Sequence, residues 1–542
     1  METIGFDLTQ MKRVPLSEEH LAAIREVGTE CSYVAGDIVA ATGEALTRFV
    51  LVLEGEIEVK DPYSEARLLE SGLGPGQFMG DINFLNGGAT ILPMRAAVDT
   101  RTVEVPRKEM LDLMARIPEL SDHIIGVFTA RRRRTFEASD SAIKVVGAER
   151  DPAVQRVASF LSRNRIPHLN FALDDDADET ARLCNLSDHE PAVFVGKDEV
   201  MADPTPRKVA QMFGLDLDVT DTGDIDLLIV GGGPAGVAAA VYAGSEGLSA
   251  LVVEDSAIGG QAGASSRIEN YMGFPTGISG ADLTLRGQIQ AMKFGTRFAM
   301  PRRVEKLERL SDRRYCATLD DGDTICAGAV LVATGVQYRR LPLDRLEEFE
   351  SAGVFYAATE MEARWCRGGT AVVIGGGNSA GQAAMYLSRS ADHVHVLIRG
   401  NSLAASMSDY LSSRLESDPR ITIDYGTSCT ALHGNTRLEA ITIEGPDGER
   451  TIDTKGLFIM IGAAPNTGWL EGHADTDERG FVKTGDAAGA ANDYATSAPG
   501  IFAVGDCRAG SVKRVASAVG EGSVVVSSIW QHIRAAKEPA TL

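Results

Sequence analysis

Residues 224–254 read DIDLLIVGGGPAGVAAAVYAGSEGLSALVVE, a stretch with the form of a complete βαβ unit. The apolar run Leu227–Val230 is typical of a buried parallel strand, and an alanine-rich helix and a second strand follow it. Gly231, Gly233 and Gly236 form the pattern G-x-G-x-x-G where the first strand turns into the helix. The unit therefore predicts a site for a dinucleotide.

Each glycine of this pattern has its own physical task. Gly231 permits a tight turn, Gly233 lets the backbone approach a pyrophosphate, and Gly236 lets the helix pack against the strand. The first turn of the helix supplies N–H groups that stabilise phosphate charge. Glu254 ends the second strand, where a carboxylate is placed to accept a hydrogen bond from a ribose hydroxyl.

Further motifs follow this unit toward the end of the chain. They are Gly259-Gly260-Gln261, ENYMGFP (269–275), LVATG (331–335), AVVIGGGNSAGQAAMYL (371–387), IGAAPNT (461–467) and PGIFAVGDC (499–507). In order and spacing these motifs resemble those of the low-molecular-weight thioredoxin reductases and their relatives. The resemblance covers over half the chain and implies two Rossmann-like domains. An FAD domain would be formed by residues 223–340 and 463–542, with a pyridine-nucleotide domain, residues 341–462, inserted between them.

The same resemblance assigns residues to FAD. The loop from Glu254 to Gln261 would contact the adenosine and pyrophosphate, and Asp506 the ribityl or pyrophosphate region. The segment 514–516 would lie near the flavin ring, although valine stands at 515 where the family usually has glutamine. The residues implied for FAD are Gly231, Gly233, Gly236, Glu254, Gly259, Gly260, Gln261, Asn270, Asp506, Arg514, Val515 and Ala516.

A second glycine fingerprint predicts the site of NADH or NADPH. It follows an apolar strand, opens a helix, and consists of Gly375, Gly377 and Ala380. Relatives that select NADPH place several arginines after the next strand, and this chain keeps only Arg399 there. One guanidinium can bind a phosphate in a bidentate manner, so NADPH and NADH both stay open, as does an ordinary surface role for this arginine. The residues expected at the nucleotide are Gly375, Gly377, Asn378, Ser379 and Arg399.

The segment before the second fingerprint lacks the sulfur atoms that the resemblance would predict. Thioredoxin reductases carry a C-A-T-C pair there, whereas this chain has Ala357-Ala358-Thr359-Glu360. Thiol-disulfide exchange needs one thiolate to attack and a second to resolve, and neither alanine nor glutamate can do either. Glu360 is a candidate proton donor or electrostatic brake beside the flavin. Cys366, six residues further on, is expected to be a packed thiol.

Residues 1–140 predict a β-roll closed by helices. Alternation over residues 49–60 indicates half-buried strands, and residues 73–85 pass through a glycine-rich turn into a short helix. The motifs at Gly36-Asp37, Glu54-Gly55, Gly76, Gly80 and Arg95-Ala96-Ala97 resemble the cyclic-nucleotide-binding domain family. That resemblance implies a ligand site at Gly80, Asp81 and Arg95. The family usually has glutamate at position 81, and the stretch from 81 to 95 is several residues longer here, so a roll used only for docking or dimer contacts is the alternative.

Residues 141–222 predict a smaller α/β unit and a linker. Helical patterns over 151–164 and 206–215 enclose strand-like stretches at 168–173 and 191–195, an order that resembles glutaredoxin or thioredoxin. Asp151 and Val154 occupy the two cysteine positions, and Pro191 precedes a strand as the family's cis-proline does. The unit is therefore expected to perform no thiol exchange. The whole chain predicts a multidomain α/β protein with an N-terminal roll, this unit and two Rossmann-like domains.

Composition limits the partners and the compartment. The net charge of -23 disfavours nucleic acid and anionic membranes, and the run Arg131–Arg134 is expected to form a solvated helix face. No apolar stretch has the length of a membrane-spanning helix, so we expect a cytoplasmic protein. Seven scattered cysteines without a C-x-x-C pair indicate free thiols in a reducing compartment.

Three functions remain open at this point. The leading hypothesis is an FAD-dependent NAD(P)H oxidoreductase that passes electrons to an external acceptor without an internal disulfide. The second is a thioredoxin-disulfide reductase that uses the thiols of a partner protein. The third is a redox-sensing flavoprotein in which the roll binds a cyclic nucleotide and controls assembly. The resemblance also implies a homodimer, and nothing in the sequence predicts a metal site.

Overall fold

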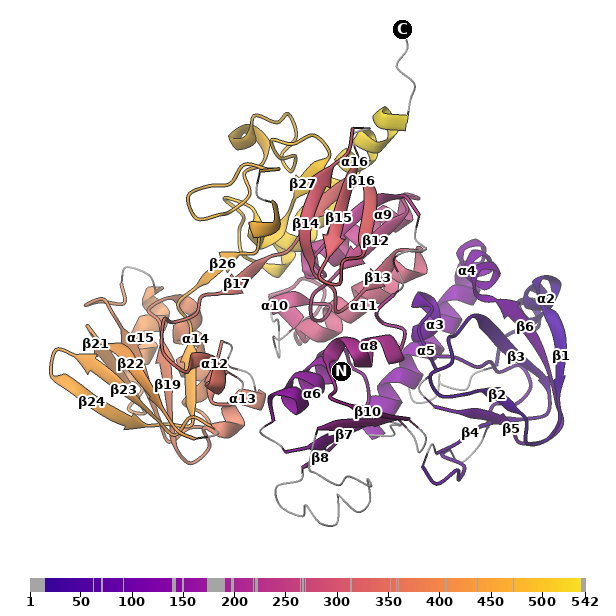
Figure 1. The fold of residues 1–542 in the computed structure, drawn as a ribbon, viewed down its shortest axis with the longest axis horizontal. Helices are drawn as coiled ribbons and strands as arrows, with labels where there is room; N and C mark the ends of the chain where they lie inside the picture. The colour runs from indigo at the N-terminus through magenta and orange to yellow at the C-terminus, as the bar shows by residue number, and fades with distance from the viewer. Residues whose placement is uncertain are drawn as a thin grey trace, which may run out of the picture.

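The computed structural model describes residues 15–537 with several gaps. The residues outside the description are 62, 70–71, 91, 139–142, 149–150, 173–190, 196–198, 218, 220–222, 264, 266–267, 269, 312–313, 351, 357, 359, 405–406, 436 and 471, besides the two ends. Figure 1 shows the N-terminal roll at the right and a large domain at the top. A second large domain lies at the left, and a small α/β unit lies between it and the roll.

The N-terminal roll consists of two three-stranded sheets, in the orders β1-β6-β3 and β2-β5-β4. Its core is aromatic, with the Phe78 ring 5.1 Å from that of Phe49 and 5.8 Å from that of Phe128. Strand β3 is buried on both faces, so the prediction of half-buried strands is right about the strands and wrong about their burial. The elements are α2 (Glu18–Val27), β1 (Thr29–Tyr33), β2 (Ile38–Ala40), β3 (Arg48–Glu54), β4 (Ile57–Val59), α3 (Asn83–Asn86), β5 (Met94–Ala96), β6 (Thr100–Pro106), α4 (Arg107–Arg116) and α5 (Pro118–Ala138).

The small unit has one four-stranded sheet in the order β10-β9-β7-β8. Strands β7 and β8 are parallel and the other two pairs are antiparallel. Its elements are β7 (Ile143–Gly147), α6 (Pro152–Arg163), β8 (Leu169–Ala172), β9 (Ala192–Val195), β10 (Glu199–Ala202) and α8 (Pro206–Met212). The predicted helices and strands are all present, and a glutaredoxin-like origin of the unit stays a prediction. Cys184 and the bond between Glu190 and Pro191 fall outside the described residues.

The large upper domain is organised around a seven-stranded sheet in the order β13-β12-β11-β16-β15-β14, with β27 paired to β16. Strand β27 comes from near the C-terminus, so two distant parts of the chain share this sheet. Helices α9 and α16 pack against each other beside it (Figure 1). The elements are β11 (Ile225–Val230), α9 (Pro234–Ser245), β12 (Ala250–Val253), α10 (Gly260–Gly263), α11 (Gly280–Lys293), β13 (Arg297–Ala299), β14 (Val304–Arg309), β15 (Tyr315–Leu319), β16 (Thr324–Val332), β27 (Ile501–Ala503), η4 (Gly505–Cys507) and α16 (Val515–Lys537).

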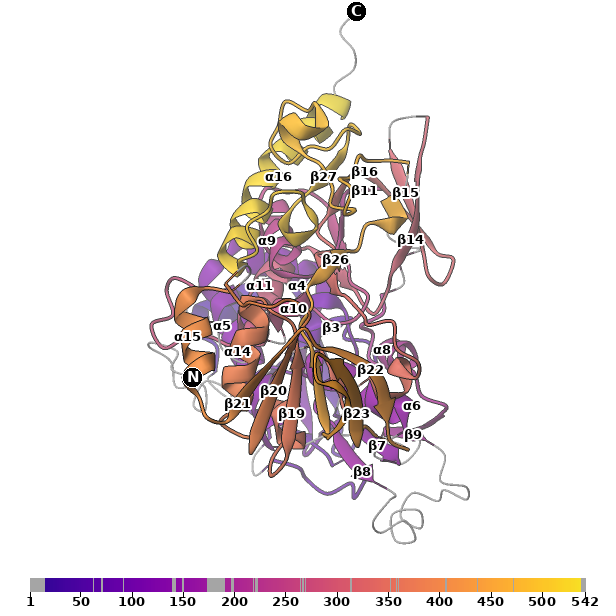
Figure 2. The same ribbon diagram turned by 90° about the vertical axis from the view of Figure 1, so that its left-hand side faces the viewer.

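The left-hand domain has a five-stranded parallel sheet in the order β18-β25-β19-β20-β21 and a three-stranded antiparallel sheet, β22-β23-β24. Strands β17 and β26 pair between the two large domains, and Figure 2 shows this connection above the sheet. The elements are β17 (Val336–Tyr338), α12 (Leu346–Phe349), β18 (Val354–Phe355), α13 (Glu360–Trp365), β19 (Thr370–Ile374), α14 (Asn378–Leu387), β20 (His393–Ile398), α15 (Asp409–Ser417), β21 (Ile421–Tyr425), β22 (Ser428–His433), β23 (Ala440–Gly445), β24 (Gly448–Asp453), β25 (Gly456–Ile459) and β26 (Ala463–Pro465). The short helices that follow, η2 (Gly468–Leu470) and η3 (Gly485–Ala488), lie with the upper domain, where Leu470 packs in the core.

A disulfide joins Cys316 to Cys326, which corrects the prediction that the cysteines are free thiols. The two residues face each other across the antiparallel pair β15 and β16. A separation of ten residues in the sequence does not reveal this, because the pairing depends on the register of the two strands. Among the described residues, Cys31, Cys366, Cys429 and Cys507 are free, as predicted.

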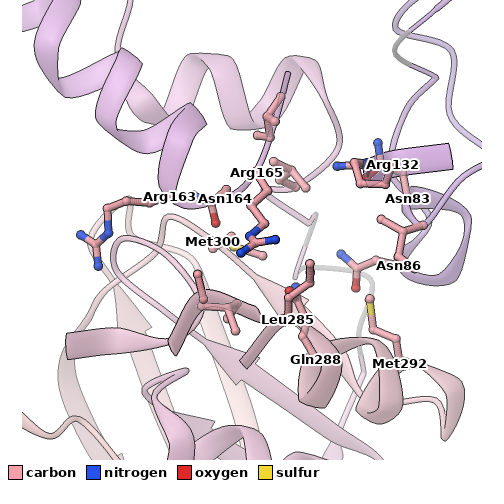
Figure 3. A pocket seen from close by; sticks show the side chains of 15 residues that line it. Asn83, Asn86, Arg132, Arg163, Asn164, Arg165, Leu285, Gln288, Met292 and Met300 are labelled. Carbon is pink, nitrogen blue, oxygen red and sulfur yellow. Dashed lines mark hydrogen bonds between the residues drawn. The ribbon is translucent and has the colours of Figure 1, made fainter. Parts of the chain in front are cut away.

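A cavity of ≈ 50 Å³ lies where the roll, the small unit and the upper domain meet. Figure 3 shows Asn83 and Asn86 of α3, Arg132 of α5, Gln288 of α11 and, from just after α6, Arg165 around it. The three parts of the chain are thus packed against one another with polar side chains at their junction. No helix in the described part of the chain is both long and apolar enough to cross a membrane.

Buried ion pairs fasten the linker after α8 to the upper domain. Arg302, with 5% of its side chain exposed, contacts Asp216 and donates to Asp321 at 2.6 Å. Arg207 of α8 donates to Asp216 from the other side, at 3.1 Å. The carboxylate of Asp216 is fully buried, so these guanidinium groups supply the partners that its charge requires. The small unit is therefore held in place at its C-terminal end.

Candidate dinucleotide sites

The first glycine loop has the close packing that its pattern predicts. Gly231 follows β11 with a φ of 107°, and a Cβ atom there would overlap the carbonyl oxygen of Ala333. A Cβ at Gly236 would overlap the carbonyl oxygen of Gly231. These two positions therefore require glycine for packing between the strands and α9.

Gly233 faces open space, in contrast to the other two glycines of the loop. It is the N-cap residue of α9, and within the described residues no side chain caps this helix end. No described atom lies within 4 Å of the position that a Cβ at Gly233 would take. Gly260 approaches the loop from the other side, since a Cβ there would lie 3.3 Å from the Cα of Gly233. The N–H of Gly259 donates to the carbonyl of Gly232 at 2.8 Å. The result is a glycine-lined cradle at a helix N-terminus, which fits the pyrophosphate of a dinucleotide.

Glu254 lies beside this cradle, directly after β12. Its side chain is buried, and its two oxygens accept from the N–H groups of Gly232 at 2.8 Å and Ser256 at 3.1 Å. Burial raises the pKa of this carboxyl to about 8, with a further contribution from Asp255, while the two N–H groups act in the opposite direction. The acid is therefore fixed where the ribose next to the pyrophosphate would lie.

We expect the stability of the FAD-free chain to depend on pH through Glu254. Between pH 4.5 and about 8 the folded chain keeps a proton that the unfolded chain has released. The free energy of unfolding should then fall as pH rises, by at most about 1.4 kcal/mol per pH unit. Thermal midpoints of the apoprotein should decline between pH 5 and 8, and Glu254→Gln should remove part of that slope. An unchanged slope in the variant would contradict this origin.

Residues from the C-terminal part of the chain meet the same end of α9. Asp506 lies in η4, whose first residue, Gly505, packs against Ala235 and donates its N–H to Glu521 at 2.6 Å. Burial raises the pKa of Asp506. Glu521 belongs to α16 and also pairs with Arg508 at 2.8 Å. The structure thus places the GDC motif beside the first fingerprint, although some 270 residues separate them in the sequence.

The remaining residues predicted for FAD differ in their surroundings. Arg514 and Ala516 are exposed, and Val515 is the first residue of α16. The Gln261 side chain donates to the carbonyl of Val336 at 2.5 Å, which ties the cradle to β17. Asn270 is exposed.

The second fingerprint repeats the geometry of the first. Gly375 follows β19 with a φ of 144°, and a Cβ there would overlap the carbonyl oxygen of Met460. Gly377 is the N-cap residue of α14, and Ala380 is fully buried. Asn378 accepts a hydrogen bond from the N–H of Ser408 at 2.8 Å.

Two other residues predicted for the nucleotide are exposed at the rim of this loop. Ser379 lies in the first turn of α14, and Arg399 follows β20 directly. The loop therefore forms a second helix N-terminus with a basic residue at the end of the adjacent strand.

The segment in which the resemblance predicts a cysteine pair, residues 357–360, is described only in part. Ala357, Thr359 and the side chain of Glu360 lie outside the described residues, and Glu360 begins α13. Cys366 is 1% exposed, and burial raises the pKa of its thiol to about 12. The prediction of a packed thiol is therefore confirmed, because such a group is protonated and shielded at neutral pH. Burial likewise raises the pKa of Cys507 to about 11.

Arg95, which the roll was expected to offer to a cyclic phosphate, is bound to Glu58. The two are partners across β4 and β5, and the guanidinium donates to the carboxylate at 2.8 and 3.2 Å. Glu58 is 7% exposed, and its pKa is lowered by the hydrogen bond from Arg95. Glu58 was not among the predicted site residues, although an acid between Ile57 and Val59 in an apolar strand is a usable signal.

Asp81 is paired in a similar way, with Arg132 of α5 at 2.8 Å. Arg131 donates to the carbonyl of Gly80 at 2.9 Å, and Gly80 has a φ of 118°. The prediction of a solvated face over residues 131–134 is therefore wrong for Arg132, whose side chain is 10% exposed. The reason is that α5 folds back onto the glycine turn, which the charge run alone cannot indicate.

Comparisons with known proteins agree with this geometry. Residues 225–522 match the family described as pyridine nucleotide-disulphide oxidoreductase, and residues 30–117 match the cyclic nucleotide-binding domain. NADPH-dependent thioredoxin reductase 3 of Arabidopsis thaliana is 33% identical over 317 residues, covering 57% of this chain and 58% of that protein. This chain thus matches less than two thirds of the plant relative. The thioredoxin reductase of Treponema pallidum (strain Nichols) is 33% identical over 313 residues, 57% of this chain and 97% of that protein.

Two solved structures of thioredoxin reductases also align with more than half of this chain. The Lactococcus lactis thioredoxin reductase, in the FR conformation, aligns with a TM-score of 0.52 and 27% identity, over 57% of this chain and 99% of that one. The T. acidophilum thioredoxin reductase aligns with a TM-score of 0.50 and 26% identity, over 57% of this chain and 98% of that one.

Proposed function

The chain belongs to the pyridine nucleotide-disulphide oxidoreductase family and is an FAD-dependent oxidoreductase, and we propose that it passes electrons from NAD(P)H to an acceptor outside the chain without a cysteine pair of its own beside the flavin. The observation that carries the proposal is the pair Ala357 and Glu360, which stand where the resemblance to thioredoxin reductases predicts cysteines. Neither side chain can form or resolve a disulfide. Cys366 is too deeply buried to replace them.

The residues of the two glycine loops would bind and orient the cofactors. The cradle at Gly233 and Gly260 would hold the pyrophosphate of FAD, and Glu254 its ribose. The loop at Gly377 would hold NADH or NADPH, with Arg399 beside the ribose of the nucleotide. Bound FAD supplies the hydride and electron chemistry. The protein positions the two cofactors relative to each other, and the identity of the electron acceptor determines which overall reaction is catalysed.

An anaerobic titration of the purified protein with NADH and with NADPH tests this proposal. We expect one of the nucleotides to bleach the flavin absorbance, and the reduced protein to be reoxidised by dioxygen or a one-electron dye faster than by a disulfide. If neither nucleotide bleaches the flavin, the proposal fails. If a disulfide is the fastest acceptor, the second candidate function replaces it.

That second candidate is a thioredoxin-disulfide reductase that uses the thiols of a partner. It is favoured by the 33% identity to the Treponema pallidum thioredoxin reductase over 97% of that protein. NADPH-dependent reduction of thioredoxin that survives Cys366→Ser would support it, because a buried thiol then plays no part. The absence of any such reduction would exclude it.

The N-terminal roll is proposed to regulate the oxidoreductase. The buried side chain of Asn86, in α3, exchanges two hydrogen bonds of 3.2 Å with the backbone of Phe298 in β13. Lys293 of α11 pairs with Asp122 of α5 at 2.8 Å. The N–H of Ala89 donates to the carbonyl of Phe213 at 3.0 Å, so the extra residues between positions 81 and 95 dock on the small unit. A conformational change in residues 81–95 would therefore be transmitted to β13, the strand that pairs with β12.

A cyclic nucleotide is the proposed ligand of the roll, and a redox sensor gated by it is the third candidate. Arg95 would have to exchange its partner Glu58 for the cyclic phosphate. Calorimetry with cyclic AMP and cyclic GMP on the full chain, repeated with Arg95→Ala, tests this. Binding that the variant loses supports the proposal. If neither nucleotide binds and turnover responds to neither, the roll serves docking alone.

The domain boundaries predicted from the sequence remain part of the proposal, as do a homodimer and a cytoplasmic location. The proposed division is 1–140, 141–222, 223–340 with 463–542, and 341–462. It agrees with the pairing of β17 with β26, which lies between the two large domains. Limited proteolysis followed by mass spectrometry should find the first cleavages near residues 141 and 222.

A further inference from the structure

The end of helix α6 in the small unit touches the upper domain through consecutive residues. Figure 3 shows Arg163, Asn164 and Arg165 beside the junction, with the Arg163 side chain directed away from Arg132 and the cavity between them. Each of the three contacts a residue of the upper domain. The small unit thus contacts the upper domain although its two expected cysteines are replaced by Asp151 and Val154.

The contacts of Arg163 and Asn164 converge on one residue. Arg163 Nη1 donates to the hydroxyl of Ser256 at 2.8 Å, and Asn164 Nδ2 donates to the carbonyl of Ser256 at 3.3 Å. Arg165 instead pairs with Asp282, near the start of α11, at 2.6 Å. The loop after β12 is thus held by two side chains, and the neighbouring helix by a third.

Ser256 is bonded in turn to the acid of the first dinucleotide site. Its N–H donates to Glu254 Oε1 at 3.1 Å. The other carboxylate oxygen accepts from Gly232, within the glycine loop. A continuous series of hydrogen bonds therefore runs from Arg163 through Ser256 and Glu254 to the cradle. The Glu254 backbone is fixed separately, since its carbonyl accepts from the N–H of Arg302 at 2.8 Å.

The small unit supplies a rigid base for this contact. Val157 and Leu161 of α6 are fully buried in its core, and Asp151 caps the helix at its start. Asn164 closes the helix, because its Nδ2 also donates to the carbonyl of Phe160 at 2.9 Å. The backbone that carries Arg163 is thus already ordered, so the contact costs the rotamer freedom of the side chain but no further backbone entropy.

We propose that Arg163 is a positioning residue for FAD, and that the small unit is a clamp which holds the loop of Ser256 and Glu254 over the adenosine half of the cofactor. This inference rests on the proposed FAD site. It gives the unit a role that needs no thiol. It also explains why the end of α6 contacts the loop after β12 and the start of α11.

The test measures release of FAD from the full-length holoprotein after dilution, followed by the rise in flavin fluorescence. Arg163→Ala is expected to speed release about fivefold, the effect of one lost hydrogen bond, and Arg163→Lys to restore part of it. Ser256→Ala should have a similar effect, and the double variant should be no worse than either single one. ADP, a probe of the adenosine half, should bind the FAD-free Arg163→Ala protein about fivefold more weakly than it binds the unsubstituted FAD-free protein.

Matched controls separate positioning from general docking. Arg165→Ala removes a neighbouring contact with the same domain but not the contact with Ser256, and Arg156→Ala removes an exposed charge from the same helix. Neither should speed the release of FAD. Equal release from Arg163→Ala and the unsubstituted protein would overturn the inference while leaving the proposed function intact, as would equally fast release from Arg165→Ala. A purified protein that binds no FAD would instead overturn the proposed function.

Discussion

Gly236→Ala is expected to give a chain that is purified without FAD. The added methyl group would overlap the carbonyl oxygen of Gly231. That oxygen belongs to the backbone of the same loop, so the overlap cannot be relieved by rotating a side chain. The helix must therefore shift away from the strand, which moves the N–H groups that would face the pyrophosphate. We expect the affinity for FAD to fall by at least about a hundredfold, roughly the effect of losing several charge-assisted hydrogen bonds.

The ratio of flavin to protein absorbance in the purified chain measures this effect. Gly520→Ala is the matched control, because Gly520 lies in α16 of the same domain and a Cβ there meets no described atom within 4 Å. The control should keep its full flavin content. A Gly236→Ala protein with the same flavin content as the control would show that the first loop does not bind the cofactor.

The double substitution Ala357→Cys and Glu360→Cys is expected to double the number of electrons that the protein accepts. Without a cysteine pair beside the flavin, NADPH or NADH should deliver two electrons for each FAD. A C-A-T-C segment adds a disulfide that takes two more. Anaerobic titration should therefore need about two equivalents of the nucleotide in the variant and about one in the unsubstituted protein. Thioredoxin reduction should appear only in the variant.

Two controls make this result specific. Ala357→Cys alone cannot form the pair and should need one equivalent. The Cys316–Cys326 disulfide must also be tested, by Cys316→Ser with Cys326→Ser. Cys326 precedes Ala333, at the glycine turn, by seven residues, roughly 23 Å along an extended strand, so we expect this change to leave the count unaltered. Two equivalents in the unsubstituted protein would contradict the proposed function.

The local features of both dinucleotide sites were predictable from the sequence. At Gly231, Gly236 and Gly375 the chain approaches another backbone so closely that a side chain does not fit. At Gly236 that backbone belongs to the same βαβ unit, whereas at Gly231 and Gly375 it belongs to Ala333 and Met460, which follow neighbouring strands of the sheet. In each case the requirement appears in the sequence as a fixed spacing of glycines. The burial of Cys366 followed from the same kind of reasoning, since an isolated thiol in an apolar setting packs as a small hydrophobic residue.

The partners of charged residues were not predictable in the same way. Arg95 and Asp81 were assigned to a ligand, whereas the structure pairs them with Glu58 and Arg132. Arg132 was expected in solvent. A charged side chain pairs with whichever oppositely charged group the fold places within about 4 Å of it. Which groups come that close depends on the tertiary structure and cannot be inferred from the sequence. The register of β15 and β16 likewise made Cys316 and Cys326 a pair.

Sequence alone therefore determined that this chain has two glycine loops of the dinucleotide-binding pattern and no sulfur at positions 357 and 360, because those properties depend on the identity and spacing of neighbouring residues. Only the tertiary structure decided that the small unit holds the loop beside Glu254 through Arg163 and Ser256. The bond joins residues 93 positions apart. It exists because α6, the β12 loop and the roll pack at one junction, and packing between separate units is a property of their folded surfaces.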